Sequence, residues 1–434
     1  MTEDRQGEES AIRPPREAGR RVKTLVMLWG MALLTPVLPL LLSFCCILVQ
    51  GWNEDTWSQI AAVLIAVGLG CGGTMFLGGA RALSLKPSKP LHLPPLWALG
   101  GGFVLSLVIG LGLWQVRGIG TILYPWFIIL AAASPPVAAV AWAMNDHPGR
   151  LTRRRAGVAF TAGVTVAVPF AFLLELLVPY ALIWLLLDLG EPVRQMLEQL
   201  VQMLAGGNVA HVITSPGFLL VLFELALVAP LAEEFTKPLV VLPLLKELGS
   251  QREAFLLGAL AGAGFAALEN IVYALSGGRY WGGVLTLRAL SAAVHPLGAG
   301  LTALGWYALV NRQAGAARRW LSNYGLAVGQ HALWNGGQTL WLALAGTMFF
   351  GPQPQETDVL GISTAVGMLA LLALEGVILL VSLRMLARRF EPERAAESLT
   401  GRVDPDRAIA LWAVICLAAL LPAGLVLLRG LWSR

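Results

Sequence analysis

The chain consists mainly of long apolar stretches separated by short polar or charged loops. Most stretches hold about 20 residues or more, the length that a helix needs to cross ~30 Å of hydrocarbon at ~1.5 Å per residue. The pattern therefore predicts an all-α fold, a polytopic transmembrane helical bundle with about eleven spans. The predicted spans are residues 24–50, 59–83, 95–116, 120–144, 157–187, 217–245, 255–275, 284–310, 325–350, 359–386 and 408–428.

Basic residues gather in alternate loops between these spans. They cluster at residues 13–23, 86–89, 150–155, 312–319 and 384–407. By the positive-inside rule these loops face the cytoplasm, which places the N-terminus in the cytoplasm and the C-terminus outside, and which requires an odd number of spans. The stretch that follows the polar N-terminus lacks a small-residue cleavage site, so we expect no removable signal peptide.

Composition supports an integral membrane protein. Hydrophobic residues make up 56% of the chain and charged residues 13%, which is too little polar surface for a water-soluble fold. Basic cytoplasmic loops beside anionic lipid headgroups account for the net charge of +5, so it gives no reason to expect a nucleic-acid partner. Cys45, Cys46, Cys71 and Cys416 lie in apolar stretches without disulfide or metal-site spacing, and we interpret them as packing residues.

The spans divide the chain into five regions. These are a basic cytoplasmic tail (1–23), an N-terminal transmembrane scaffold of five spans (24–187), an extracytoplasmic loop (188–216), a transmembrane core of four spans (217–350), and two final spans joined by a charged cytoplasmic linker (351–434). Apolar positions from Val193 to Leu204 in the loop share one helical face, which predicts an interfacial amphipathic helix or, alternatively, part of a gate.

The core spans carry ionisable residues, which cost roughly 2.5 to 3.5 kcal/mol each at the membrane centre. In the first core span, Glu233 and Lys237 are four residues apart and share a helical face, while Glu234 lies about 100° around the axis. Pro230, Pro238 and Pro243 interrupt the backbone hydrogen bonds nearby, which tends to open a helix and admit water. A Glu and Lys pair alone would be a neutralised structural pair, but the second glutamate favours a functional site.

The second core span carries a stripe of small and polar residues. Gly258, Gly262, Phe265 and Glu269 follow the four-three-four spacing of one helical face, with Asn270 beside them. Small residues permit close packing of neighbouring helices. We therefore expect this face to present a carboxylate to an internal polar cavity.

The third and fourth core spans supply histidines. His295 lies in the third, and His331 and Asn335 are four residues apart in the fourth, with Gln338 extending the stripe. A single membrane histidine is most often a hydrogen-bonded interior residue. Here, however, the rise of ~1.5 Å per residue puts His295, Glu233 and Asn335 at similar depth, so the side chains of four helices are expected to converge.

These motifs resemble those of the PrsW family of intramembrane proteases. The resemblance rests on Glu233-Glu234-x-x-Lys237, Phe265-x-x-x-Glu269-Asn270, His295 and His331-x-x-x-Asn335, and it covers roughly residues 230–336. The CAAX-prenyl protease superfamily is similar in its paired glutamates and final His-x-x-x-Asn, but it has a histidine where this chain has Glu269. That difference favours the PrsW family.

The resemblance implies a protease that hydrolyses peptide bonds of membrane-anchored proteins. In bacteria the expected targets are anti-sigma factors. Residues 217–350 would form the catalytic core. Glu233 or Glu234 would act as general base, His331 and Asn335 would donate to the oxyanion, and Lys237 would orient a glutamate. Alternatively Glu269, His295 and His331 would hold zinc, although the chain has no His-Glu-x-x-His motif. No cofactor is certain from the sequence.

Two other classes of protein use buried polar residues. A proton-coupled secondary transporter would also place Glu, Lys and His at the membrane midplane on broken helices, but it usually shows a repeated half, and we find none here. A noncatalytic membrane scaffold would not need four buried polar motifs. The expected partners are therefore a membrane-anchored protein substrate and the lipid bilayer, and the oligomeric state is not predicted.

Overall fold

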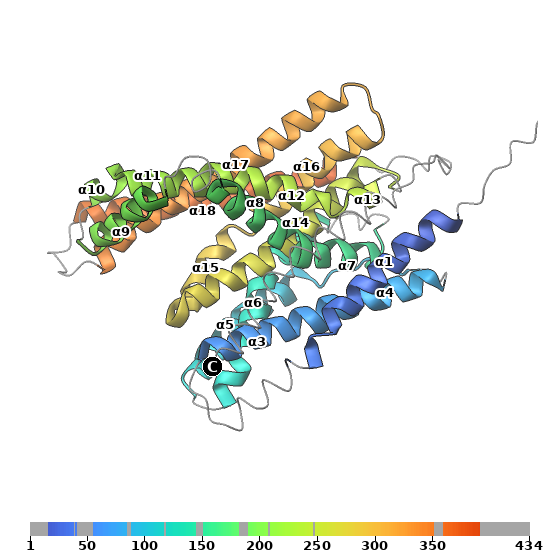
Figure 1. Ribbon diagram of the computed structural model, residues 1–434, viewed down its shortest axis with the longest axis horizontal. Coiled ribbons are helices and arrows are strands. Elements are labelled where there is room, and N and C mark those ends of the chain that lie inside the picture. Colours follow the sequence, from blue (N-terminus) through green and yellow to red (C-terminus); the bar gives the residue numbers. More distant parts are fainter. Residues whose placement is uncertain are drawn as a thin grey trace, which may run out of the picture.

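The computed structural model describes residues 16–38, 40, 55–84, 88–116, 119–144, 151–181, 190–206, 209–245, 248–350 and 359–390. Across these residues the fold is helical, without β-strands and with one isolated bridge between Pro90 and Thr152 (Figure 1). The predicted all-α class is therefore confirmed.

The helices follow one another in chain order, and several are joined directly through π-helical turns (η1, η2 and η4). The N-terminal helices are α1 (Arg16–Leu34), α3 (Asp55–Ala66), η1 (Val67–Gly72), α4 (Gly73–Leu83), α5 (Leu96–Trp114), α6 (Ile119–Met144), α7 (Arg153–Ala162), η2 (Gly163–Ala167) and α8 (Val168–Ala181). The later helices are α9 (Gly190–Gly206), α10 (Val209–Thr214), α11 (Pro216–Phe223), η4 (Glu224–Val228), α12 (Ala229–Leu239), α13 (Leu242–Leu245), α14 (Gln251–Ser276), η5 (Gly278–Tyr280), α15 (Trp281–Leu290), α16 (Val294–Val310), α17 (Ala316–Phe350) and α18 (Val359–Arg389).

Six helical segments are long and apolar enough to cross a membrane, and each corresponds to a predicted span. They are Gln59–Leu83, Leu96–Trp114, Ile122–Met144, Arg153–Glu175, Gln251–Ser276 and Ile362–Arg389. The predicted span 284–310 is instead two helices, α15 and α16, which bend by 41° and together make a seventh candidate. The protein is therefore an integral membrane protein with six or seven candidate spans among its described residues.

The predicted count of eleven spans is not confirmed. The predicted spans 217–245 and 325–350 do not pass the same test of length and hydropathy. They contain Glu233, Glu234, Lys237 and His331, and polar residues lower the mean hydropathy of the helices that carry them. The predicted span 408–428 and part of 24–50 lie outside the described residues.

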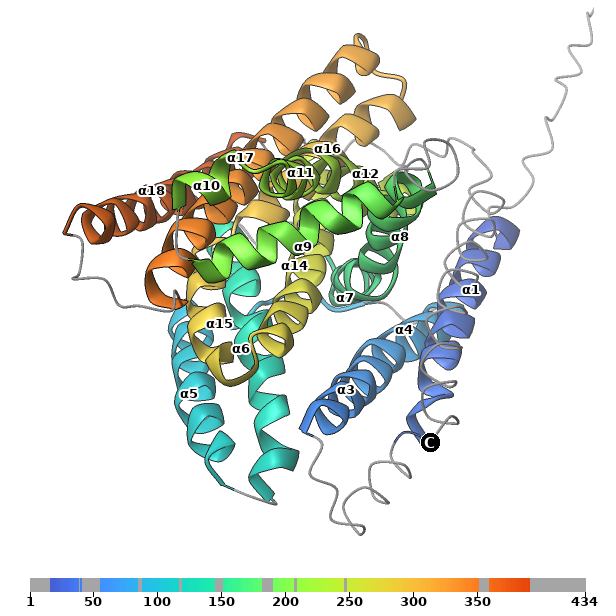
Figure 2. The same ribbon diagram turned by 60° about the vertical axis from the view of Figure 1, so that its left-hand side comes forward.

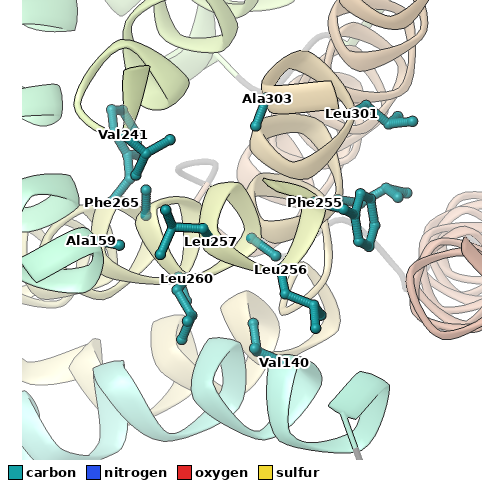
Figure 3. Packing of buried hydrophobic residues seen from close by; sticks show 14 of the residues in the cluster. Val140, Ala159, Val241, Phe255, Leu256, Leu257, Leu260, Phe265, Leu301 and Ala303 are labelled. Carbon is teal, nitrogen blue, oxygen red and sulfur yellow. The ribbon is translucent and has the colours of Figure 1, made fainter. Parts of the chain in front are cut away.

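Helix α14 lies at the centre of the fold and packs against α6, α7, η2 and α16. Figure 3 shows Leu256, Leu257 and Leu260 of this helix among side chains of neighbouring helices, including Val140 of α6 and Ala159 of α7. All five side chains are buried in one hydrophobic cluster. Such close packing fixes the helices that carry the polar residues.

Glycines allow α14 and α16 to approach each other closely. A Cβ atom on Gly258 would lie 2.6 Å from the carbonyl oxygen of Ala299, and one on Gly262 would lie 2.7 Å from the carbonyl carbon of His295. Real Cβ atoms essentially never come within 3.0 Å of such neighbours. The packing role predicted for these two glycines is confirmed.

Helices α1, α3 and α4 form a group at one side of the molecule (Figure 2). Gly79 of α4 meets α1 closely, because a Cβ there would lie 2.7 Å from the backbone nitrogen of Met27. This group joins the rest of the fold partly through contacts of α4 with α7.

The predicted amphipathic segment is helical, as α9. Its Leu200 is buried in a small cluster with Val212, Phe218 of α11 and Ala343 of α17. The apolar face therefore packs at least partly against protein, and the interfacial location of this helix stays a prediction.

Candidate active site

Polar residues of the core lie at the end of one helix, α12, and at the start of another, α16. Helix α12 ends just after Pro238, so Lys237 lies in its last turn. The turn at residues 291–293 separates α15 from α16 and puts His295 in the first turn of α16. His295 was predicted to lie within one continuous span, residues 284–310, and the break corrects that prediction. The turn itself holds a serine and two alanines, but Pro296 follows it and has no N–H for the carbonyl of Ala292, which disfavours a continuous helix here.

Lys237 is fully buried and bridges three side chains. Its Nζ atom lies 2.8 Å from Glu233 Oε2, 2.7 Å from Glu234 Oε1 and 2.7 Å from His295 Nδ1. The Phe265 ring covers the ammonium group, with its centroid 4.3 Å from Nζ. Buried charges are tolerated when they are paired and hydrogen-bonded in this way, so the predicted pairing of Glu233 with Lys237 is present and includes Glu234.

Each histidine has one ring nitrogen against a carboxylate. His331 Nδ1 lies 2.8 Å from Glu234 Oε1, and His295 Nε2 lies 2.7 Å from Glu269 Oε2. The opposite nitrogens face a third carboxylate: His295 Nδ1 is 3.6 Å and His331 Nε2 is 3.8 Å from Glu233 Oε2. A carboxylate at the outer nitrogen favours a proton there and directs the lone pair of the inner nitrogen toward Glu233.

Two buried atoms of this cluster have no hydrogen-bond partner among the described residues, His331 Nε2 and Glu234 Oε2. Buried polar atoms in native proteins are nearly always paired, and an exception calls for an explanation such as an ion, a water or a catalytic role. Glu233, His295 and His331 each offer a ligand atom, and these atoms lie within 4.8 Å of one another. Of the two inner imidazole nitrogens, His331 Nε2 therefore lacks a partner, whereas His295 Nδ1 is bonded to Lys237 Nζ.

Arg288 belongs to the cluster although its sequence context gave no reason to select it. The side chain comes from α15, is 2% exposed, and donates to Glu269 Oε2 at 2.6 Å and to Asn270 Oδ1 at 2.8 Å. Its guanidinium also lies over the Tyr273 ring. The only signal in the sequence that could have identified Arg288 is its position as a lone arginine inside the otherwise apolar predicted span 284–310.

Asn270 donates to a backbone carbonyl that a proline leaves without its usual donor. Pro136 has no N–H group and cannot donate to the carbonyl of Ala132 four residues earlier in α6. Asn270 Nδ2 donates to that carbonyl at 3.0 Å, while its Oδ1 accepts from Arg288. Asn270 therefore ties α14 to α6 and α15 beside Glu269.

Asn335 makes the same kind of contact with η4. The Ala229 amide bonds to the Glu224 carbonyl in this wide turn, and the following residue is Pro230, which has no N–H for the Leu225 carbonyl. Asn335 Nδ2 donates to Leu225 O at 2.9 Å. This contact holds α17 against η4. The Asn335 amide that was predicted to donate to the oxyanion is therefore already bonded to a backbone carbonyl.

Replacing either asparagine by alanine is expected to lower the free energy of unfolding by about 1–3 kcal/mol, because a backbone carbonyl loses its donor. The measurement is thermal or denaturant unfolding of purified Asn270→Ala and Asn335→Ala proteins in detergent. Gln202→Ala changes an exposed amide on α9 and is the control. Unchanged stability with lost activity would instead indicate a direct catalytic role.

The structure thus brings together six predicted site residues by direct contact, Glu233, Glu234, Lys237, Glu269, His295 and His331. The compact group that could hold a metal contains Glu233 with the two histidines, whereas the sequence analysis selected Glu269. Gln338 accepts from Trp334 Nε1 and does not extend the site.

Three carboxylates and two imidazoles are thus gathered inside an integral membrane protein. Membrane-embedded hydrolases are a class that uses such groups to activate water, either directly or on a bound metal. The chain belongs to one family of this class: the model of the PrsW family, described as PrsW family intramembrane metalloprotease, matches residues 152–374, about half of the chain. The matched region extends beyond residues 230–336 and includes α7 to α9 and part of α18. Searches of curated proteins and of solved structures found no match.

Proposed function

We propose that this protein is an intramembrane protease that hydrolyses peptide bonds of membrane-anchored proteins at the cluster formed by α12, α14, α16 and α17. We base the proposal on the two imidazoles, each fixed by a carboxylate at its outer nitrogen and facing Glu233 with its inner nitrogen. Anti-sigma factors are the substrates that we expect in a bacterial cell. The family match supports proteolysis and not the transporter alternative.

The residues present fit a metal ion. Two histidines and one glutamate form a common ligand set of catalytic zinc, and histidine ligands usually carry a carboxylate at the other nitrogen. Glu233, His295 and His331 would hold the ion, with Glu269 and Glu234 orienting the imidazoles. When bound, the metal would supply a polarised, acidified water and a positive charge for the carbonyl oxygen of the substrate.

Glu234 is the carboxylate that we assign as general base. Its Oε1 is held by Lys237 and His331, but its Oε2 has no partner among the described residues. A base must have a free lone pair within reach of the proton that it accepts. Glu234 Oε2 would take the proton of the attacking water and deliver it to the leaving amine.

Lys237 balances the charge of Glu233 and Glu234 and keeps the two carboxylates in place. In the structure its ammonium group contacts Glu233 Oε2 and His295 Nδ1, two of the atoms that a metal would use. A bound cation would therefore compete with Lys237 for these atoms. The lysine would keep its contact with Glu234 and so support the base.

Water and substrate would reach the cluster from the side of Glu233 and Glu269. The side chains of these two residues are 8% and 17% exposed, whereas those of Lys237 and Glu234 are fully buried. The buried Phe265 ring covers the Lys237 ammonium group and lies close to the His295 ring. A low-dielectric wall of this kind strengthens the electrostatic interactions within the site.

Arg288 is a positioning residue in this proposal, because it holds Glu269 against His295. Arg288→Gln is expected to weaken metal binding and to lower kcat by about 10- to 100-fold, the usual effect of losing an outer partner of a ligand, with little change in KM. The measurements are metal affinity and cleavage kinetics of purified protein.

Arg279→Gln, which changes an exposed arginine that contacts Tyr280, is the matched control for Arg288→Gln. The double variant Glu269→Gln/Arg288→Gln removes both charges and keeps the buried charge balance. Wild-type metal affinity in folded Arg288→Gln protein would show that Glu269 needs no arginine to orient His295.

The membrane proteome provides the test of the function itself. Cells carrying Glu234→Gln in place of the wild-type protein are expected to accumulate at least one uncut membrane-anchored protein, whose shortened form is present in wild-type cells. The purified wild-type protein is then expected to cleave that substrate in nanodiscs. Identical membrane proteomes in both strains, with the variant fully expressed, would contradict proteolysis.

We also propose that α11 to α13 and α17 cross the membrane, with the N-terminus in the cytoplasm and the C-terminus outside. Together with the seven candidate spans and the two predicted spans at residues 24–50 and 408–428, they would make the eleven of the prediction. The alternating basic loops support this orientation.

A further inference from the structure

Gln330 of α17 makes a hydrogen bond between the two helices that carry the site histidines. Its Nε2 atom donates to the Val294 carbonyl of α16 at 3.0 Å. Val294 directly precedes His295 in the chain, and Gln330 directly precedes His331. The bond therefore joins the backbone beside one imidazole to the side chain beside the other.

The start of α16 follows a break and needs restraint from other helices. The turn at residues 291–293 bends the chain by 41° between α15 and α16, and Pro296 has no N–H group for the Ala292 carbonyl. The hydrogen-bond ladder of α15 therefore does not fix the rotation of the first turn of α16. Close packing against α14 restrains this turn at the His295 carbonyl, and Gln330 restrains it one residue earlier.

The bond is not needed to satisfy the backbone. Val294 O lies within α16, where a carbonyl accepts from the amide four residues later, here that of Gly298. Gln330 also donates to Ala327 O at 3.2 Å, a carbonyl that likewise lies within a helix, α17. Gln330 thus differs from the two asparagines of the site, each of which replaces a donor that a proline lacks.

The other half of the Gln330 amide is unfavourable for folding. Its Oε1 atom is buried and has no hydrogen-bond partner among the described residues. An unpaired buried acceptor loses its bonds to water and gains nothing in return. The side chain also borders a cavity of about 660 Å³ with Leu297 and Leu326 in its wall, so an apolar side chain of the same length would fit. A glutamine here therefore has a reason other than stability.

We propose that Gln330 is a positioning residue that sets the distance and angle between the His295 and His331 imidazoles. The two ring centroids lie 4.9 Å apart, and the ring planes meet at 83°. In this arrangement both inner nitrogens face one atom, Glu233 Oε2. Rotation of the first turn of α16 would move the His295 ring away from that atom, because the ring moves with its backbone. Only the consequences for metal binding and catalysis rest on the proposed function.

The first test needs neither metal nor substrate. The chain has five histidines, so NMR of histidine-labelled full-length protein can follow their ring signals singly. In metal-free Gln330→Met, which keeps the length of the side chain but has no N–H donor, the signals of His295 and His331 are expected to shift. Those of His92 and His211 are expected to stay. The melting temperature is expected to stay or rise, because the unpaired Oε1 atom is removed as well.

The second test measures Zn²⁺ affinity and cleavage of the substrate found in the membrane proteome. Gln330→Met is expected to bind Zn²⁺ about 10-fold more weakly, as when a ligand loses an outer partner. Its kcat is expected to fall by about 100-fold with little change in KM, because a displacement of about 1 Å at a reacting group has an effect of this order. Gln330→Asn is one methylene shorter, loses the bond to Val294 O, and replaces Gln330→Met if that protein does not fold.

The matched control is Gln338→Met, which removes another amide of α17, one that accepts from Trp334. It is expected to leave the ring signals, the Zn²⁺ affinity and kcat unchanged. Unshifted signals of both site histidines in folded Gln330→Met, or equal shifts in the control, would overturn the proposal. The same shifts in a protein whose wild type binds no Zn²⁺ and cleaves nothing would contradict the proposed function and still support the positioning of the imidazoles.

Discussion

Glu233→Gln is expected to abolish cleavage and metal binding together. The amide keeps the size of the side chain but removes the charge that faces His295 Nδ1 and His331 Nε2. Glu234→Gln is expected to lower kcat by about 10²–10⁴-fold, the usual contribution of a general base, while the metal content stays close to that of the wild type. The measurements are cleavage of the identified membrane substrate and elemental analysis of the purified proteins.

The two variants distinguish a ligand from a base because Glu233 and Glu234 are neighbours with similar surroundings but different contacts. Glu191→Gln on α9 removes an exposed carboxylate of the same type and is expected to leave both readouts unchanged. Wild-type protein that contains no metal and cleaves equally well after chelation would contradict the metal site. In that case Glu233, which lies between the two imidazoles, becomes the base.

Gly298→Ala is expected to lower cleavage by about 100-fold without loss of the fold. A Cβ atom at this position would lie 2.7 Å from Glu234 Cδ. The carboxylate cannot retreat freely, because Lys237 and His331 hold its Oε1. A displacement of about 1 Å at a reacting group costs on the order of 10² in rate.

Helix propensity separates this effect from a folding defect. Alanine is favoured over glycine within a helix by about 0.8–1.0 kcal/mol, so the substitution in α16 is expected to help the helix itself. Gly329→Ala in α17 is the matched control, since a Cβ there would meet nothing within 4 Å. Cleavage by Gly298→Ala within twofold of this control would show that the position of the Glu234 carboxylate is not critical.

Much of the helical fold could be predicted from the sequence. Helices such as α5 and α6 matched their predicted spans, because a continuous apolar stretch of this length is itself the cause of membrane insertion. Prediction was weaker where the chain carries the site. The bend of 41° between α15 and α16 lies just before Pro296, which cannot donate to the carbonyl of Ala292, but the continuous apolar pattern of residues 284–310 still favoured a single span.

The chemical groups of the site could also be predicted, but not all of their partners. Glu233, Glu234 and Lys237 lie within one helical turn, so their spacing alone puts them in reach of each other. The spacing of Gly258 and Gly262 likewise predicted a closely packed face on α14, although not that α16 would be the helix packed against it. These are local relations, for which the geometry of the helix is sufficient.

The sequence by itself therefore determined the class of fold, the set of side chains available for chemistry and the family. The tertiary structure alone decided which carboxylate faces both imidazoles, that Arg288 holds Glu269, and that Asn335 bonds to Leu225 O, a partner 110 residues away. The physical reason is that such contacts depend on the rotation and bending of whole helices against one another. Helical periodicity places side chains on a face, but it does not determine what that face meets.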